Sequence, residues 1–262
     1  MDILSTTLKE QQSQSFVAFF LSDMHLSPQN PDHIQRLEGF VDEVLHLPQP
    51  VKIFFLGDVF DLWVGTASPV KTLVQPLLQK LKSLQDRGGE VFFFEGNHDL
   101  HLDIYFAKRW RFQVVKDSWQ GELAGFKVCL EHGDLFDPED TGYLFLRKFL
   151  RKAWVRFLLL NIIPDFVINR VGTYFSKQSS KNTKYKPTAS QDREDQTEHK
   201  LKNYAASKHA AGIDVFICGH THQRNSFELS PQKLLINLGT WQDQAPKVLG
   251  LTFDQTFMFL DC

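Results

Sequence analysis

The chain has 262 residues, 42% of them hydrophobic, which is enough to build a sizeable core and excludes disorder throughout. Its 29 Lys and Arg residues against 31 Asp and Glu residues give a formal net charge of -2, which argues against nucleic acid as a partner. The sequence has no run of about 18 uninterrupted apolar residues, which argues against a membrane-spanning helix.

Short apolar runs alternate with helical patterns in the N-terminal part of the chain. The expected buried strands are residues 16–21, 51–56 and 90–94, each followed by a polar turn. Residues 32–47 have helical spacing with Asp32 as the N-cap, and residues 70–86 form a second helical pattern that Pro76 should kink. This alternation predicts βαβ units in an α/β fold, with a sheet that is covered on both faces.

The regular alternation of predicted strands and helices ends in the second half of the chain. Further strands are expected at residues 126–131, 214–218, 233–238 and 248–253. Between them, residues 142–175 are helical, aromatic and basic, and residues 176–197 are polar. We therefore expect a core made of residues 1–137 and 201–262. A helical insertion or cap should occupy residues 138–200, with a flexible polar stretch on its far side.

The three cysteines do not form a redox or zinc motif. Cys129 and Cys218 lie in strand-like apolar runs, and no CxxC spacing involves them or Cys262. Packed, reduced thiols are therefore expected, which fits a reducing cytoplasm. The N-terminal segment lacks the basic start and the apolar stretch of a secretory signal, so the sequence predicts a cytoplasmic location.

Polar residues gather where the predicted strands end, and imidazole, carboxylate and amide groups dominate among them. They are Asp23, His25, Asp58, Asn97, His98, His132, His220 and His222. Because the carboxyl ends of strands in an open α/β sheet line one crevice, these residues should converge. Such a mixture suits a pair of ions such as Mn²⁺, Fe²⁺ or Zn²⁺ better than Ca²⁺, and Asp58 is the natural bridging carboxylate.

Each of these motifs alone has a simpler explanation as solvated turn chemistry, and a lone Asp-x-His or Gly-Asp pair predicts little. The complete set in order resembles the five sequence blocks of the calcineurin-like metallophosphoesterases. The blocks are Asp23-Met24-His25, Gly57-Asp58-Val59-Phe60-Asp61, Gly96-Asn97-His98-Asp99, His132-Gly133-Asp134 and Gly219-His220-Thr221-His222.

This resemblance implies a two-layer α/β/β/α sandwich with two divalent metals at the edge of the sheets, Mn²⁺ being favoured over Fe²⁺ or Zn²⁺. It implies one metal held by Asp23, His25 and His222, and a second held by Asn97, His132 and His220, with Asp58 bridging. It also implies that His98 acts near the leaving group or the scissile phosphate, oriented by a carboxylate for which Asp61 is the candidate.

A narrower resemblance is to the bacterial UDP-2,3-diacylglucosamine hydrolases. It rests on Trp63 after the second block, on Asp140-Thr141-Gly142-Tyr143, on Leu238-Gly239-Thr240-Trp241 and on the helical insertion. That family cleaves a doubly acylated UDP-sugar to UMP and 2,3-diacylglucosamine 1-phosphate in lipid A biosynthesis. It typically has Arg and Glu where this chain has His98 and Asp61, so this chain is either a divergent member or a relative with another substrate.

The expected substrate contacts follow the same resemblance and the composition of the insertion. They are Asp140, Tyr143, Ser176, Lys177, Ser180, Lys181, Lys184 and Trp241. For the polar stretch that begins at Ser176, a solvated linker is an equally good explanation.

The insertion also predicts a membrane contact. Residues 143–175 contain six basic residues against one acidic residue, with apolar residues at helical spacing on the other side. A basic amphipathic helix of this kind lies on an anionic membrane surface. We therefore expect a peripheral protein on the cytoplasmic face of the inner membrane. The alternative is that the apolar stripe packs on the core, and both can hold.

Three other functions compete with this interpretation. A phosphodiesterase or nucleotide pyrophosphatase for soluble substrates would need the same metals and no lipid. A nuclease is disfavoured by the net charge and by the lack of a long basic stripe with interleaved aromatic residues outside the insertion. A non-catalytic scaffold on the same fold should have lost ligands, and this chain keeps every one of them. The oligomeric state stays open.

Overall fold

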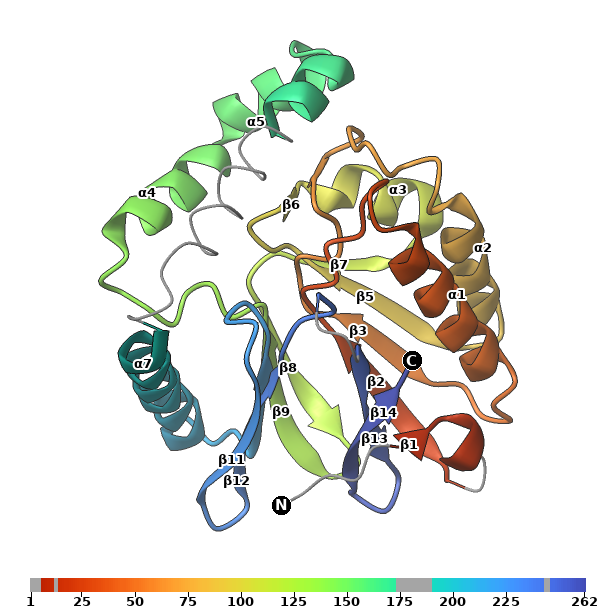
Figure 1. The fold of residues 1–262 in the computed structure, drawn as a ribbon, viewed down its shortest axis with the longest axis vertical. Coiled ribbons are helices and arrows are strands. Elements are labelled where there is room, and N and C mark those ends of the chain that lie inside the picture. Colours follow the sequence, from red (N-terminus) through yellow and green to blue (C-terminus); the bar gives the residue numbers. More distant parts are fainter. Residues whose placement is uncertain (1–5, 12–13, 173–189, 243–245) are drawn as a thin grey trace.

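Two β-sheets pack face to face, and helices cover the outer face of each (Figure 1). The computed structural model describes residues 6–11, 14–172, 190–242 and 246–262. Helices α1 (Pro31–Leu45), α2 (Gln75–Asp86) and α3 (Phe106–Trp110) lie on one side, and α7 (Ser190–Ala210) lies on the other. The predicted α/β/β/α sandwich is confirmed.

The first sheet has seven strands and is mainly parallel. Its order is β1 (Thr6–Thr7), β14 (Phe257–Asp261), β13 (Lys247–Thr252), β2 (Phe16–Leu21), β3 (Lys52–Phe55), β5 (Glu90–Phe94) and β7 (Gln113–Val115). Strands β2, β3, β5 and β7 are parallel, whereas β13 is antiparallel to both of its neighbours. The carboxyl ends of β2, β3 and β5 therefore meet at one edge of the sheet.

The second sheet has five strands. Its order is β11 (Arg224–Ser230), β12 (Lys233–Leu238), β10 (Val215–Cys218), β9 (Phe126–Glu131) and β8 (Ser118–Leu123). The short strands β4 (Trp63–Val64) and β6 (Asp99–Leu100) pair separately. Two 3₁₀ turns are η1 (Lys9–Gln11) and η2 (Leu102–Ile104).

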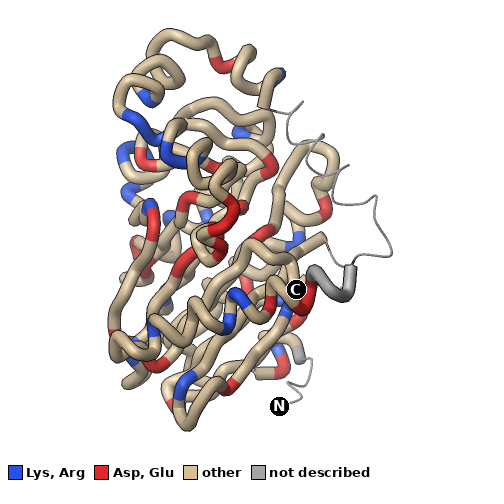
Figure 2. The backbone as a smooth tube through the Cα atoms, turned by 90° about the vertical axis from the view of Figure 1, so that its left-hand side faces the viewer, with Lys and Arg blue, Asp and Glu red and all other residues tan. Residues whose placement is uncertain are grey.

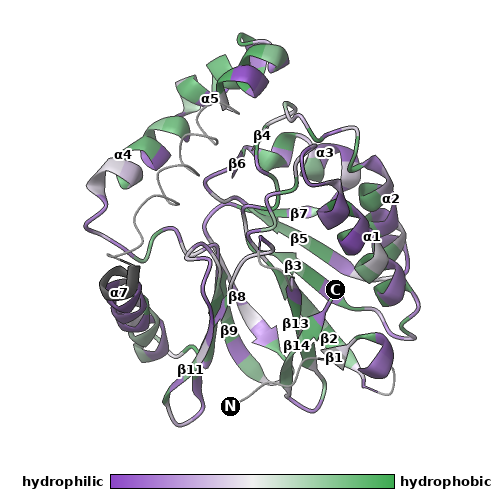
Figure 3. Ribbon diagram, in the orientation of Figure 1, coloured by the Kyte–Doolittle hydropathy of each residue, from purple (hydrophilic) through white to green (hydrophobic). Residues whose placement is uncertain are grey.

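Phenylalanines on the central strands explain why these strands are apolar at successive positions. Phe55 and Phe93 stack at 4.6 Å on the side of α1 and α2, while Phe54 and Phe92 stack at 4.4 Å between the two sheets. Because both faces of these strands are buried, apolar and polar residues do not alternate along them. Burial of each ring contributes roughly 1.5–3 kcal/mol to the stability of the fold. The hydrophobic colouring of the central strands follows this arrangement (Figure 3).

The insertion extends beyond the strand ends as α4 (Thr141–Leu150), α5 (Ala153–Asn161) and a further helical stretch over residues 165–172 (Figure 1). Residues 190–197, which were expected in the polar stretch, are instead the first part of α7. Leu201 and Ala205 anchor that helix on the second sheet, so its polar N-terminal part continues a helix that is already packed. The division of the chain into core and insertion stays a prediction.

Two details of the predicted helices were wrong. The second helix begins at Gln75, so Pro76 stands in its first turn, where the missing N–H costs nothing, and it does not kink a longer helix. The first helix begins at Pro31 with Asn30 as N-cap, so Asp32 lies in its first turn. Seven strands in the described part of the chain were missed, namely the two-residue strands β1, β4 and β6 and the longer strands β7, β8, β11 and β14. The side chains of β8 and β11 alternate between partly buried and exposed.

The cysteines are free thiols, two of them fully buried, as predicted. Among the helices that the structure describes, none has both the length and the apolar character needed to cross a bilayer.

Candidate metal centre

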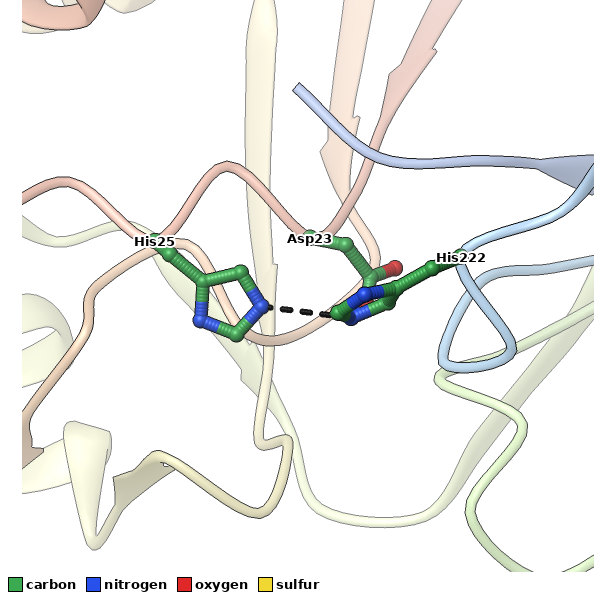
Figure 4. A group of neighbouring side chains, drawn as sticks. All are labelled: Asp23, His25 and His222. Carbon is green, nitrogen blue, oxygen red and sulfur yellow. Dashed lines mark hydrogen bonds and ion pairs between the residues drawn. The ribbon is translucent and has the colours of Figure 1, made fainter. Parts of the chain in front are cut away.

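The turns that follow β2, β3, β5, β9 and β10 bring the predicted ligands together at one edge of the two sheets. Figure 4 shows Asp23 and His25 from the turn after β2 beside His222 from the turn after β10. Nε2 of His25 lies 3.3 Å from Nε2 of His222, which in turn lies 3.3 Å from Oδ1 of Asp23. Two ring nitrogens and a carboxylate oxygen thus face one point, which is the donor set of a divalent cation such as Mn²⁺, Fe²⁺ or Zn²⁺.

A second group of donors lies next to the first. Oδ1 of Asn97 lies 3.1 Å from Nε2 of His132 and 3.1 Å from Nδ1 of His220. Nδ1 of His132 donates to the backbone carbonyl of Leu56 at 2.8 Å, which leaves Nε2 as the nitrogen that faces the site. A hydrogen bond of this kind fixes the tautomer that a metal-ligating histidine needs.

Asp58 lies between the two groups. Its carboxylate falls within a 4.8 Å cluster with His25 and His98 on one side, and within another with His132 and His220 on the other. Oδ1 accepts hydrogen bonds from the backbone N–H groups of Asn97 and His98, both at 2.9 Å. Burial raises the pKa of Asp58, but His132, His98 and His25 outweigh it, so the net pKa is lowered and the group is ionised. This position fits the predicted bridging role.

Backbone strain is concentrated at the ligands. Five of the seven predicted ligands have a positive φ, namely Asp23 (50°), His25 (46°), Asp58 (50°), His220 (70°) and His222 (61°). Asp and His tolerate the left-handed region better than most residues, and such strain gathers at functional sites. Gly96 and Gly219 are required by close approach, because a Cβ there would collide with the carboxylates of Asp58 and Asp23 respectively.

His98 stands beside the first group. Its ring meets the ring of His25 edge to face at a centroid distance of 4.8 Å. Burial lowers its pKa, but the carboxylate of Asp58 and the carbonyl of Asp61 more than compensate, so the pKa is raised. Nδ1 donates to the backbone carbonyl of Asp61 at 2.9 Å, so the orienting group is this carbonyl and not the carboxylate that was expected.

Asp99 is a structural part of the site that the sequence analysis left without a role. Its fully buried carboxylate accepts from the backbone N–H groups of Gly96 at 2.7 Å, Val59 at 2.8 Å and Asp58 at 3.1 Å. It therefore ties the turn after β3 to the turn after β5 and fixes the backbone on which Asp58 and Asn97 are presented. The only sequence signal was its place at the end of the third block.

Of the expected substrate contacts, the structure contradicts Trp241, while Asp140 and Tyr143 stay predictions. Trp241 is 2% exposed and packs in one core cluster with residues of α1. Its indole N–H donates to the backbone carbonyl of Lys247, so the side chain cannot reach a substrate. Asp140 is the N-cap of α4 and accepts from the N–H of Tyr143, whose hydroxyl donates to Asp134. The other predicted contacts, Ser176, Lys177, Ser180, Lys181 and Lys184, lie outside the described residues.

Several basic residues of the insertion contact the core, which corrects the expectation that they form a membrane-facing surface. Arg147 pairs with Asp134 at 2.6 Å and with Asp117 at 2.7 Å. The other two pairs are Arg151 with Glu95 at 3.2 Å and Arg156 with Asp103 at 2.7 Å. An ion pair between a half-buried arginine and a carboxylate stabilises the contact between the insertion and the core. These three arginines therefore face the core and not a membrane.

The chain is similar in sequence to known proteins over most of its length. A family model described as "Calcineurin-like phosphoesterase" matches residues 17–224. A protein of Aliivibrio fischeri named UDP-2,3-diacylglucosamine hydrolase is 30% identical over 86% of this chain and 90% of its own length. One of the same name from Haemophilus influenzae is 26% identical over 93% and 98%. Vacuolar Protein Sorting 29 from Cryptosporidium parvum is a solved structure with 14% identity, covering 91% of this chain and 86% of its own, at a TM-score of 0.41.

Proposed function

Because this chain belongs to the calcineurin-like phosphoesterase family and is a metal-dependent hydrolase, we propose that its substrate is UDP-2,3-diacylglucosamine. Hydrolysis of the pyrophosphate would give UMP and 2,3-diacylglucosamine 1-phosphate for lipid A biosynthesis. The observation that carries the proposal is that the relatives described above are named for this substrate and align over nearly their full length.

The residues of the site fit two divalent cations, with Mn²⁺ favoured. Asp23, His25 and His222 would hold one, Asn97, His132 and His220 the other, and Asp58 both. When bound, such a pair supplies a hydroxide at neutral pH and neutralises the phosphoryl oxygens. The chain itself contributes His98, whose Nδ1 proton is fixed on the carbonyl of Asp61, so that Nε2 is left to bind or protonate the substrate.

The insertion supports an acylated substrate. Most of the large hydrophobic side chains that are exposed on the described surface belong to it, namely Phe145, Leu146, Trp154, Phe157, Leu158, Ile162, Phe166 and Val171. The hydrophobic colouring of α5 shows the same concentration (Figure 3). An apolar patch of this extent beside a phosphoesterase site is what acyl chains would cover.

The same face supports attachment to the cytoplasmic surface of the inner membrane. With Arg147, Arg151 and Arg156 paired to the core, the exposed cations of α4 and its junction with α5 are Lys148 and Lys152. Each lysine near an anionic surface contributes about 1 kcal/mol. Attachment would therefore depend on the aromatic side chains more than on charge.

A double variant tests the role of this face. Trp154→Ser with Phe157→Ser should reduce hydrolysis of the acylated substrate and binding to anionic vesicles at least about tenfold, since each exposed ring that enters lipid contributes roughly 1.5–3 kcal/mol. The hydrolysis of bis(p-nitrophenyl) phosphate should not change, because it needs only the metals. Phe253→Ser is the matched control, because Phe253 is 61% exposed against 57% for Phe157 but lies outside the insertion.

Equal losses on both substrates would mean that the two aromatic residues support the fold. Full activity on both would favour the alternative function, a phosphodiesterase or nucleotide pyrophosphatase for soluble substrates, and would remove the main support for the lipid.

A further inference from the structure

The segment that follows His98 is fixed to the metal centre at its start. The backbone N–H of Trp63 donates to the carbonyl of His98 at 3.0 Å, and that of Gly65 donates to the carbonyl of Leu100 at 2.9 Å. Strand β6 thereby pairs with β4, and the carboxylate of Asp99 holds the turns on either side. A residue at the end of this segment therefore has a fixed place relative to His98.

His101 ends the fixed segment and joins both helices of the insertion. The residue is 2% exposed and its backbone is left-handed, with φ of 56°. Nε2 lies 3.2 Å from the carbonyl oxygen of Leu150 in α4, and Nδ1 lies 3.2 Å from Nη1 of Arg156 in α5. A guanidinium only donates, so Nδ1 accepts and Nε2 carries the proton. One imidazole therefore spans the break between α4 and α5.

A neutral ring is the state that these contacts require. Burial and the neighbouring Arg156 lower the pKa of His101 to about 4, so the ring is neutral at pH 7. Arg156 is itself held by a two-pronged ion pair, with Nη1 2.9 Å from Oδ1 and Nη2 2.7 Å from Oδ2 of Asp103. Asp103 lies in η2, the 3₁₀ turn that follows His101. The same stretch of the core therefore contacts Arg156 of α5 twice, through His101 and through Asp103.

We propose that His101 and Asp103 are positioning residues that hold the insertion at a fixed place relative to His98. The insertion then forms one wall of the site and is docked on the core. Figure 2 marks Lys and Arg in blue along the backbone, and three arginines of the insertion, Arg147, Arg151 and Arg156, pair with core carboxylates. The consequence for catalysis rests on the proposed function: a substrate that spans the metal centre and the apolar face needs this alignment, whereas a small ester does not.

Hydrogen–deuterium exchange of the full-length, metal-loaded protein tests the docking without any substrate. His101→Asn keeps a residue that tolerates the left-handed backbone but is too short for either contact. Arg156→Gln removes the ion pair. In both variants the amides of α5 should exchange at least about tenfold faster, the loss expected for a hydrogen bond to a charged group. Lys148→Gln, an exposed charge loss on α4, is the control and should exchange like the wild type.

The reversed pair, Asp103→Arg with Arg156→Asp, separates a direct contact from general damage. It should restore most of the protection that Arg156→Gln loses. Wild-type exchange in both single variants, or no recovery in the reversed pair, would overturn the proposal.

Activity gives the second readout. The docking variants should lose at least about tenfold in kcat/KM on the acylated UDP-sugar and stay within about twofold on bis(p-nitrophenyl) phosphate. A wild-type protein that is inactive on the acylated substrate would contradict the proposed function, while the exchange data would still decide the docking role of His101 and Asp103.

Discussion

An Asp58→Ala variant should lose more than about 10³-fold in turnover and should bind fewer metal ions than the wild type. The carboxylate of Asp58 faces both donor groups, and no other described carboxylate belongs to both. Its loss would remove a ligand from each cation. Bound metals lower the activation free energy of such a reaction by several kcal/mol, and about 1.4 kcal/mol corresponds to a factor of ten in rate. Metal content by elemental analysis and turnover on bis(p-nitrophenyl) phosphate measure both effects.

The control for this experiment is Asp86→Ala, which removes an exposed carboxylate that pairs with Lys82 at the end of α2. It should keep full metal content and activity. Two tightly bound metals together with normal turnover in Asp58→Ala would show that the metal centre has been assigned to the wrong residues.

His98→Ala should lower turnover by roughly 10²–10⁴, the usual range for a general acid or base, and should leave the metal content intact. Asp61→Asn should have a much smaller effect, because the group that orients the ring is the backbone carbonyl of Asp61, which the substitution keeps. Comparing the two variants therefore separates the function of the imidazole from that of its support.

Two outcomes would change the role of His98. Loss of metal in His98→Ala would make it a ligand, since its ring lies within one cluster with His25 and Asp58. Full activity of His98→Arg on the acylated substrate would instead indicate that this position anchors a phosphate by charge, because arginine cannot act as a general acid at neutral pH.

The sequence was most informative where strands are buried on both faces. Four of the seven expected strands, at residues 16–21, 90–94, 126–131 and 233–238, have the predicted bounds. Continuous apolar runs cannot be accommodated in an exposed strand, and a polar turn marks each end. The ligands were predictable for a related reason, because each stands immediately after such a run and parallel strands bring their ends together.

Outside the metal centre, the partners of individual side chains could not be predicted. Arg147, Arg151 and Arg156 have helical spacing that fits a membrane surface as well as it fits a row of core carboxylates. Only the tertiary structure decides between these partners. Trp241 was misjudged for the same reason, since its indole finds a hydrogen-bond acceptor inside the core. The role of His101 had no sequence signal either, because nothing local indicates that it joins two helices.

The central claim is that the dimetal centre acts on an acylated UDP-sugar. The most direct measurement is to incubate the Mn²⁺-loaded protein with UDP-2,3-diacylglucosamine in detergent micelles and to follow the products by mass spectrometry. The account predicts UMP and 2,3-diacylglucosamine 1-phosphate in equal amounts, and their absence with Asp58→Ala. Intact UDP-sugar after incubation with an enzyme that still cleaves bis(p-nitrophenyl) phosphate would contradict the claim.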